Sequence, residues 1–503
     1  MNKIVSRRVL TVLFAASACM IGTAAAAQEV QAKAAPVKQE VQTKAVPIKQ
    51  EAQTKENSVK QVNFQTMTNQ ENLPPAIANQ KPVEAQTLDI DLTRTVETAV
   101  RNNRDINISE WTLKEAQSAV GEAAAGKNPS VSYGFSAERY KAKNTNGYSV
   151  SSGGTVTPVT VSTNHTYGNS LDVTWPLYTG GKVEGEIEAA RYSARVSEQS
   201  LYETEAAIKL SAISGYYQLL EDMNLQDVDQ ESVNNLSEHL TNVQQQYQAG
   251  IVARLDVLTS TVSLANAKQI YIESANTRNL AEANLNNIMR TPVSTKLIPV
   301  DKTMPQPPFT ITQEQAEAMA MQYRWELKEA DYNVEIAKQQ LREAHSGHMP
   351  TVALTGGYTW NNEDFPGFKN QNWTVTGSVS LPIFDGGVTN AKIQEAKDVL
   401  KIAEETAAKE HESIQLEVKQ DYLNVVSAKE RIATTTAAVE QAEEAYKIAV
   451  VRYKAGVGIN LDVLDAQLSL NSAKTNYITA LYDYNIGLAT LDKAMGVPAV
   501  IRR

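Results

Sequence analysis

Two periods of hydrophobic and polar positions run along this 503-residue chain. The longer period fills Lys182–Gln248 and Val388–Lys454, which contain no proline and where apolar side chains recur at steps of three or four, as at Val439, Ala442 and Tyr446. That spacing is typical of amphipathic helices packed in a coiled coil. At 1.5 Å per residue, each stretch predicts a rod of about 100 Å.

A short break follows each rod, at Ala249-Gly250 in the first case and at Ala455-Gly456 in the second. Helical periodicity then resumes over residues 253–289 and 461–495. So short a break leaves room only for a tight reversal, and glycine is the residue that commonly ends a helix. The sequence therefore predicts two antiparallel helical hairpins with glycine at their tips.

The shorter period, in which apolar and small polar residues alternate, predicts four strands of about ten residues. The apolar positions are Val131, Tyr133 and Phe135, then Leu171, Val173 and Trp175, then Val352, Leu354, Tyr358 and Trp360, and finally Trp373, Val375, Val379 and Leu381. One helix is expected before each pair of strands, over residues 92–125 and 313–345. Pro129 and Pro350 prevent these helices from continuing.

These elements occur twice, because the chain is internally duplicated. Trp175–Gly181 matches Leu381–Gly387, and Tyr247–Gly250 matches Tyr453–Gly456, each pair 206 positions apart. The predicted first repeat, 87–300, holds a β-hairpin at 129–178 and a helical hairpin at 182–289. The second, 301–503, holds a β-hairpin at 350–384 and a helical hairpin at 388–495. About fifteen extra residues between Pro129 and Pro176 suggest an exposed loop.

The first residues predict an export signal over 1–27. Lys3, Arg7 and Arg8 precede an apolar run, and the alanines before Gln28 supply a cleavage site. Cys19, the only cysteine, would be acylated if this were a lipoprotein signal, but the leucine usual three positions earlier is replaced by alanine. We favour cleavage before Gln28, which leaves a mature chain without disulfides.

Residues 28–86 are predicted to be a low-complexity periplasmic linker. Three eleven-residue units, beginning at Glu29, Glu40 and Glu51, have balanced charges and few large apolar groups, so they cannot support a core. The simplest interpretation is an extended spacer. The alternative is that its regularly spaced lysines contact anionic cell-wall polymer.

Composition excludes several functional classes. The net charge of −10 disfavours a nucleic-acid partner, which needs positively charged stripes. The chain has no phosphate loop, nucleophile elbow or His-Glu-x-x-His motif, and His345 and His348 lack nearby carboxylate or cysteine partners. We therefore expect no enzyme activity, no cofactor and no metal site.

The alternating strands carry the membrane prediction. After the signal, no stretch approaches the roughly 20 apolar residues of a membrane-spanning helix, so a crossing would require a closed β-barrel. Strands with one apolar and one small polar face suit lipid on one side and water on the other, although a half-buried soluble hairpin gives the same pattern. Four strands cannot close a barrel, so the chain must oligomerise.

The order helix, β-hairpin, helical hairpin, repeated twice, resembles the TolC family of outer-membrane efflux proteins. The segment from Tyr453 to Ala466, with Leu381–Gly387 second, is the most specific element. The resemblance implies an α+β membrane protein, a homotrimer with a twelve-stranded barrel in outer-membrane lipid and a helical tunnel projecting into the periplasm. It also implies an exit duct for drugs, small molecules or polypeptides, supplied by an inner-membrane transporter through a periplasmic adaptor (membrane fusion) protein.

The same resemblance assigns residues at the hairpin tips. Asp462 and Asp465 match the paired acidic residues of the periplasmic entrance and share a helix face, so three copies would form two carboxylate rings that attract cations. Tyr453 and Asp256 match a hydrogen-bonded entrance latch. Gly458 stands where some members carry a second latch arginine, a role that Arg254 could take.

Two further groups of residues are expected to shape the duct. The tips are expected to receive the adaptor through Gly250, Ile251, Val252, Gly456 and Val457. The strands are expected to turn into the helices, where barrel meets tunnel, at Pro129, Pro176, Gly180, Gly181, Pro350, Pro382, Gly386 and Gly387. We interpret these prolines and glycines as architectural.

Two alternatives remain at this stage. An envelope-spanning coiled-coil tether without transport activity would share the helices but would not need amphipathic strands. The polar loop 141–170 could also be a surface contact for a phage or bacteriocin.

Overall fold

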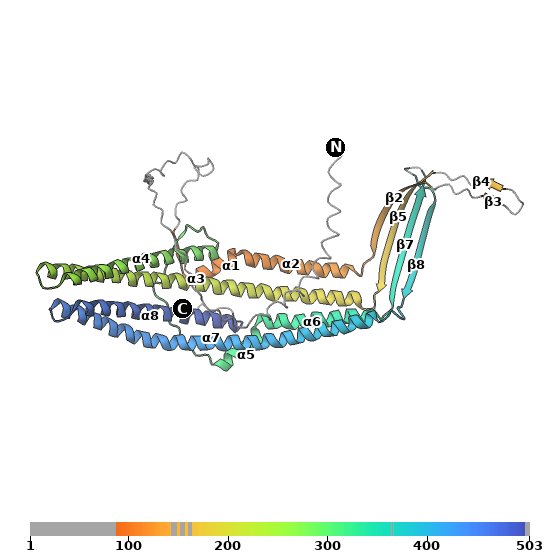
Figure 1. Cartoon of the computed structure of the whole chain (residues 1–503). Coiled ribbons are helices and arrows are strands. Elements are labelled where there is room, and N and C mark those ends of the chain that lie inside the picture. Colours follow the sequence, from red (N-terminus) through yellow and green to blue (C-terminus); the bar gives the residue numbers. More distant parts are fainter. Residues whose placement is uncertain are drawn as a thin grey trace, which may run out of the picture. The chain divides into compact units, whose positions relative to one another are not determined.

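The computed structural model describes residues 87–141, 148–150, 156–158, 163–363, 365 and 367–497 (Figure 1). They belong to one compact unit, Lys81–Arg503. The predicted signal peptide, Cys19, the repeats of the linker and the centre of the long loop lie outside the described residues.

Two 67-residue helices, α3 (Lys182–Gln248) and α7 (Val388–Lys454), begin and end at the predicted residues. Each reverses into a shorter helix, α4 (Arg254–Met289) or α8 (Asn460–Ala494), which packs along it as an antiparallel hairpin (Figure 1). Within the described residues, no helix combines the length and the hydropathy needed to span a membrane.

The structure corrects the expectation of one continuous helix before each β-hairpin. The first is divided into α1 (Leu92–Asn102) and α2 (Arg104–Ala125), and the second into α5 (Gln313–Tyr323) and α6 (Trp325–Ser346). Asn103 is extended at the first break, and its side chain caps α2 by accepting a hydrogen bond from Asp105 N (2.7 Å). Arg324 is extended at the second break, where its buried guanidinium bonds to α6, α7 and the end of α8.

A four-stranded antiparallel sheet joins the two repeats in the order β2-β5-β7-β8. Its strands are β2 (Ser130–Lys141), β5 (Thr163–Tyr178), β7 (Thr351–Asn362) and β8 (Gln371–Ser380). The long loop between β2 and β5 carries a small hairpin of β3 (Tyr148–Val150) and β4 (Val156–Pro158). The short parallel pair of β1 (Thr87–Ile90) and β6 (Lys296–Pro299) was not predicted.

The main core lies around the middle of the long helices. Large side chains from four helices are fully buried there, among them Tyr216, Leu285, Ile414 and Tyr484. α1 and α5 pack beside this core. Toward the hairpin tips the core narrows to two small clusters, so polar contacts carry more of the packing between hairpins.

Candidate functional site at the hairpin tips

Both tips end their first helix in the same way. Gly250 (φ 75°) and Gly456 (φ 72°) adopt the left-handed conformation, which favours glycine because it has no Cβ. At the second tip, Gly456 N donates to Tyr453 O (3.0 Å) and Val457 N donates to Arg452 O (3.0 Å). The first tip has the same pair of bonds, which defines a Schellman motif. The tip glycines therefore have a demonstrable turn role.

The residues around these glycines differ in accessibility. Ile251 and Val457 are 69% and 68% exposed and are available for contact with another molecule. Val252, in contrast, packs inward against a buried cluster of Val243, Tyr453 and Val463. Of the apolar residues predicted to dock an adaptor, two lie on the surface and one holds the tips together.

Tyr453 lies in this cluster on α7. Its ring meets His239 of α3 edge to face, with centroids 4.9 Å apart, and its buried hydroxyl has no hydrogen-bond partner among the described residues. Burial, and then the negative charge of Asp256, raise the pKa of Tyr453. The structure thus brings the predicted latch residues Tyr453 and Asp256 near each other without a hydrogen bond between them.

Asn460, the first residue of α8, is the centre of a buried polar network. Its Oδ1 accepts from His239 Nε2 (2.6 Å) and from Ser260 Oγ (3.1 Å), while its Nδ2 donates to Thr259 Oγ1 (3.0 Å) and Asp256 O (3.3 Å). All four groups belong to α3 or α4, so one amide ties α8 to the other hairpin. Burial lowers the pKa of His239.

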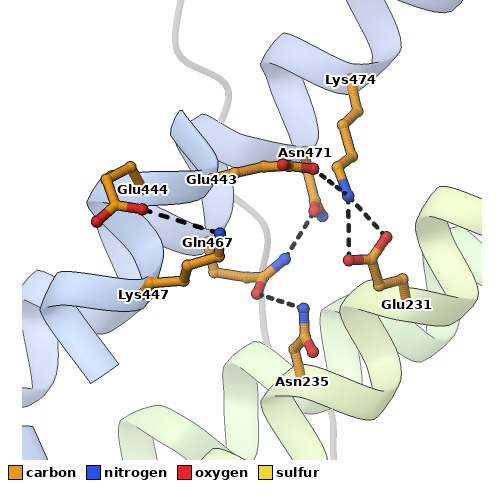
Figure 2. A network of polar contacts seen from close by, with 8 residues as sticks. All are labelled: Glu231, Asn235, Glu443, Glu444, Lys447, Gln467, Asn471 and Lys474. Carbon is orange, nitrogen blue, oxygen red and sulfur yellow. Dashed lines mark hydrogen bonds and ion pairs between the residues drawn. The ribbon is translucent and has the colours of Figure 1, made fainter. Parts of the chain in front are cut away.

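Two more polar contacts connect α3 and α8 farther from the tip (Figure 2). We call each of these contacts, and the one at Asn460, a rung. Asn235 Nδ2 donates to Gln467 Oε1 (3.1 Å), and Gln467 Nε2 donates to Asn471 Oδ1 (2.7 Å). Lys474 Nζ pairs with Glu231 of α3 (2.9 Å) and with Glu443 of α7 (3.2 Å). Lys447 and Glu444, also drawn, pair along α7 at 3.8 Å.

The rungs follow a single line on each helix. Glu231, Asn235 and His239 are four residues apart on α3 and therefore share a face. Their partners on α8 run in the opposite order, Lys474, Gln467 and Asn460, because the helices are antiparallel. We call this set of six residues the α3–α8 seam.

The predicted acidic residues lie at the start of α8 and are exposed. Asp462 Oδ2 accepts from Ile459 N (3.4 Å), which caps the helix. Asp465 lines a groove of about 350 Å³ between the hairpins, whose apolar side chains are Leu236, Ala267, Ile270, Leu461, Leu464 and Leu468. Arg254 is exposed and makes no ion pair within the described part of the chain.

Gly458 has a local reason to be glycine. A Cβ at this position would lie 3.1 Å from Tyr453 N and 3.2 Å from Arg452 C, closer than most real Cβ contacts. An arginine at position 458 would therefore require the turn to move.

The junctions between strands and helices follow the predicted residues with one difference. Gly180, Gly181, Gly386 and Gly387 all have positive φ, between 69° and 92°. Pro176 lies inside β5, where the register shifts next to Tyr178, because proline cannot donate to the ladder. Pro382 instead follows the end of β8 at Ser380, so the second β-hairpin ends before the predicted bound of 384. Pro129 and Pro350 immediately precede β2 and β7.

The sheet has the predicted two faces. One cross-strand row contains Tyr133, Leu171, Tyr358 and Trp373, and the next row contains Ser132, Asp172, Gly357 and Thr374. Tyr133 and Trp373 are 62% and 73% exposed. Large apolar residues thus cover one face in the single chain and are not buried by it.

Sequence reasoning missed the α3–α8 seam. Amides and a histidine on long helices look like solvated positions, and only alignment of the repeats distinguishes them. Position 239 is histidine where the second repeat has Ala445, and position 460 is asparagine where the first has Arg254. The signal available was a change of residue type between equivalent positions of the two copies, such as histidine at 239 against alanine at 445.

Comparison with known proteins gives consistent matches. The family model described as outer membrane efflux protein matches residues 95–289 and 318–497. The chain is 22% identical to the outer membrane protein TolC of Escherichia coli K12 over 346 residues, covering 65% of this chain and 69% of TolC. It is 24% identical to the probable efflux pump outer membrane protein TtgC of Pseudomonas putida over 419 residues, covering 80% and 82%. Its fold is similar to that of the outer membrane protein VceC of Vibrio cholerae, with a TM-score of 0.67 at 19% identity, covering 81% and 96%.

Proposed function

Because this outer-membrane chain belongs to the outer membrane efflux protein family, we propose that three copies form one exit duct that is gated at the hairpin tips. The duct receives a drug, another small molecule or a polypeptide from an inner-membrane transporter and releases it outside the cell. No chemical step is assigned to the chain.

The proposal depends on one observation: the surfaces of α7 and α4 that are equivalent, by the duplication, to the α3–α8 seam have no partner helix within the described part of the single chain. The duplication makes Asn235 equivalent to Gln441 of α7, and Gln467 equivalent to Thr261 of α4. Both equivalents are exposed in the single chain. If α7 pairs with α4 as α3 pairs with α8, the partner α4 belongs to another copy. Such a head-to-tail contact closes into a ring when its rotation is suitable.

The sheet supports the same arrangement. β2 (12 residues) and β8 (10 residues) are its outer strands. Long unpaired edges are a liability that proteins cover. Pairing β8 of one copy with β2 of the next removes every edge after three copies and gives twelve strands. A closed barrel is the only sheet that satisfies its backbone groups in lipid.

The two faces of the sheet fit such a barrel. The face that carries Tyr133, Tyr358 and Trp373 would meet lipid, and the face that carries Ser132, Asp172 and Thr374 would line the water-filled interior. A coiled-coil tether would have no use for the exposed apolar face, which is why we favour a duct.

The tips provide the gate in this proposal. Three exposed copies each of Asp462 and Asp465 would form two carboxylate rings, and such rings favour cations in a pore. Asp256 lies near enough to Tyr453 to act on its pKa, so the two remain candidates for a latch. Arg254 is a candidate partner from α4 of a neighbouring copy.

A periplasmic adaptor would dock at the same end. The groove beside Asp465 lies between two hairpins and combines leucine, isoleucine and alanine side chains with polar ones, and amphipathic helices commonly lay an apolar face into a groove with apolar side chains. Exposed Ile251 and Val457 extend this apolar surface to the tips. We expect the transporter behind the adaptor to select the substrate.

Single-channel recording tests the proposal. The mature protein in planar bilayers should give small, cation-selective currents, and replacing Asp462 and Asp465 together with alanine should abolish the selectivity and weaken block by multivalent cations. Asp227→Ala is the matched control. This exposed carboxylate lies about 30 Å from the tip along α3, by the helical rise per residue, and its loss should change neither property. Folded trimers that never conduct would instead favour the tether.

A further inference from the structure

Helix α2 has a free face in the single chain. The four helices nearest the sheet lie in the order α2, α3, α6, α7 (Figure 1), so α6 packs between α3 and α7, whereas α2 packs extensively only on α3 within the described residues. The uncovered part of α2 exposes Ile108 (61%) and Trp111 (66%). These two side chains are three positions apart and therefore adjacent on one face of the helix.

The duplication identifies this face. The shift of 221 positions that relates the two helices before the β-hairpins makes Trp111 equivalent to Tyr332 of α6. Tyr332 contacts α3: its ring centroid lies 6.0 Å from that of Tyr192, and the guanidinium of Arg195 lies 5.8 Å from it. The free face of α2 thus corresponds to the face of α6 that packs on α3.

The partner that this correspondence requires is α7 of another copy. α7 is equivalent to α3, and it is the other outer helix of the four in one chain. β2 directly follows α2 and β8 directly precedes α7. Pairing β8 of one copy with β2 of the next, as proposed above, therefore brings α7 of the first copy beside α2 of the second.

The charges at this contact differ from those of its counterpart within the chain. Glu203 of α3 lies near Glu326 of α6, and burial, followed by the charge of Glu326, raises the pKa of Glu203. The equivalent positions are Lys409 on α7 and Asp105 on α2, both exposed. A contact within one chain benefits from a high effective concentration and can tolerate like charges. A contact between copies must supply its own free energy, and here the charges are opposite.

We propose that Trp111 is the anchor by which one copy of the chain holds the next. Its indole packs against Lys401 on α7 of the neighbouring copy, in the way that Tyr332 packs against Arg195 within the chain, and the pair of Asp105 with Lys409 sets the register. Lys401 is exposed, and tryptophan is the aromatic side chain that attracts a cation most strongly. The proposal rests on the trimeric duct proposed above and names the residues by which the chain recognises a second copy of itself.

Dilution of the mature protein in mild detergent, followed by analytical ultracentrifugation, tests the anchor. Trp111→Ala should raise the concentration at which half of the chains are trimeric by about tenfold or more, because a central aromatic anchor commonly dominates an interface. Tyr202→Ala is the matched control. Tyr202 is 41% exposed, but it lines a groove between α3, α6 and α8 of its own chain, so its loss should leave assembly unchanged. Circular dichroism of the monomers shows whether each variant is folded.

A charge exchange tests the register. Asp105→Lys and Lys409→Asp should each weaken assembly, and the double variant should recover most of it. Asp105→Lys also removes a carboxylate from the first turn of α2, where it favours the helix. Recovery in the double variant is therefore the diagnostic result, because only the pairing of the two charges is restored.

Cross-linking identifies what covers the face. Ile108 and Lys409 are equivalent to Glu329 and Glu203, which are close enough for Glu203 to raise the pKa of Glu329. Ile108→Cys with Lys409→Cys, treated with a short bis-thiol reagent, should give dimers and trimers on a denaturing gel, and each single variant should stay monomeric. Trimers that do not cross-link, or that assemble equally well with Trp111→Ala and with Tyr202→Ala, would overturn this contact alone. A mature chain that forms no trimer at any concentration would overturn the proposed duct as well.

Discussion

Arg324 offers the sharpest prediction about stability, because it is a buried cation with three identified partners. Its side chain is 5% exposed at the break between α5 and α6. Nε donates to Glu326 (2.7 Å), Nη2 to Glu417 (2.6 Å) and Nη1 to Ala494 O (3.0 Å). These bonds join α6, α7 and the end of α8 at one point.

Arg324→Ala should lower the free energy of unfolding by about 3–5 kcal/mol, the usual cost of removing one partner from a buried ion pair. Two carboxylates and a carbonyl would lose their donors. The nearby Asp421 already has its pKa raised to about 6 by burial and by Glu417, and Arg324 opposes that rise. The loss should therefore be larger at pH 8, where Asp421 is charged and needs the cation, than at pH 5, where Asp421 is mostly protonated.

Urea unfolding of the detergent-solubilised trimer at the two pH values measures this effect. Arg431→Ala is the control, because Arg431 pairs with Asp483 at 2.8 Å on the surface. Surface ion pairs contribute only about 0–1 kcal/mol. The reasoning would be refuted if Arg324→Ala lost no more stability than Arg431→Ala, or if its loss of stability did not depend on pH.

Three other predictions concern separate parts of the chain. Gly456 has a φ of 72°, so Gly456→Ala should lower stability by about 1–2 kcal/mol, the cost of a left-handed residue with a Cβ. Gly121→Ala inside α2, where a Cβ meets nothing, should be neutral or stabilising; thermal unfolding compares the two, and equal effects would remove the strain argument. Burial raises the pKa of Glu221 and Glu329 from 4.5 to about 7. The folded state then binds more protons between these values, so stability should fall as pH rises through this range. Glu221→Gln should flatten that slope, and a rising slope would show that other groups dominate. Trp373→Arg, on the apolar face of the sheet, should reduce assembled trimer in the membrane at a cost of about 2–4 kcal/mol, whereas Thr374→Arg on the polar face should not; similar yields would contradict the assignment of faces.

The duplication explains why so much of the fold could be predicted. The bounds of α3 and α7 follow from runs without proline that lie between glycines. Because both copies have glycines at equivalent positions, each copy supports the bounds predicted for the other. The breaks at Asn103 and Arg324 could not be predicted in this way. Neither residue is a strong helix breaker. The break at Asn103 is capped locally by a side chain that the fold buries, and the break at Arg324 depends on a buried guanidinium that reaches α7 and the end of α8.

At the tips, the sequence predicted the two turns but not the α3–α8 seam. Gly250 and Gly456 are local signals, because a left-handed residue after a helix needs no other part of the chain. His239 and Asn460 are distant in sequence, and their 2.6 Å contact depends on how two hairpins pack. Periodicity places such residues on a helix face but does not identify the helix that they face.

The most direct test of the gated trimeric duct is ion selectivity across the tip. Reversal potentials in asymmetric salt should show cation preference for the mature protein and for Asp227→Ala. They should approach zero, which indicates no selectivity, when Asp462 and Asp465 are both alanine. Selectivity that survives the double replacement in correctly assembled trimers would contradict the assignment of the gate to the hairpin tips.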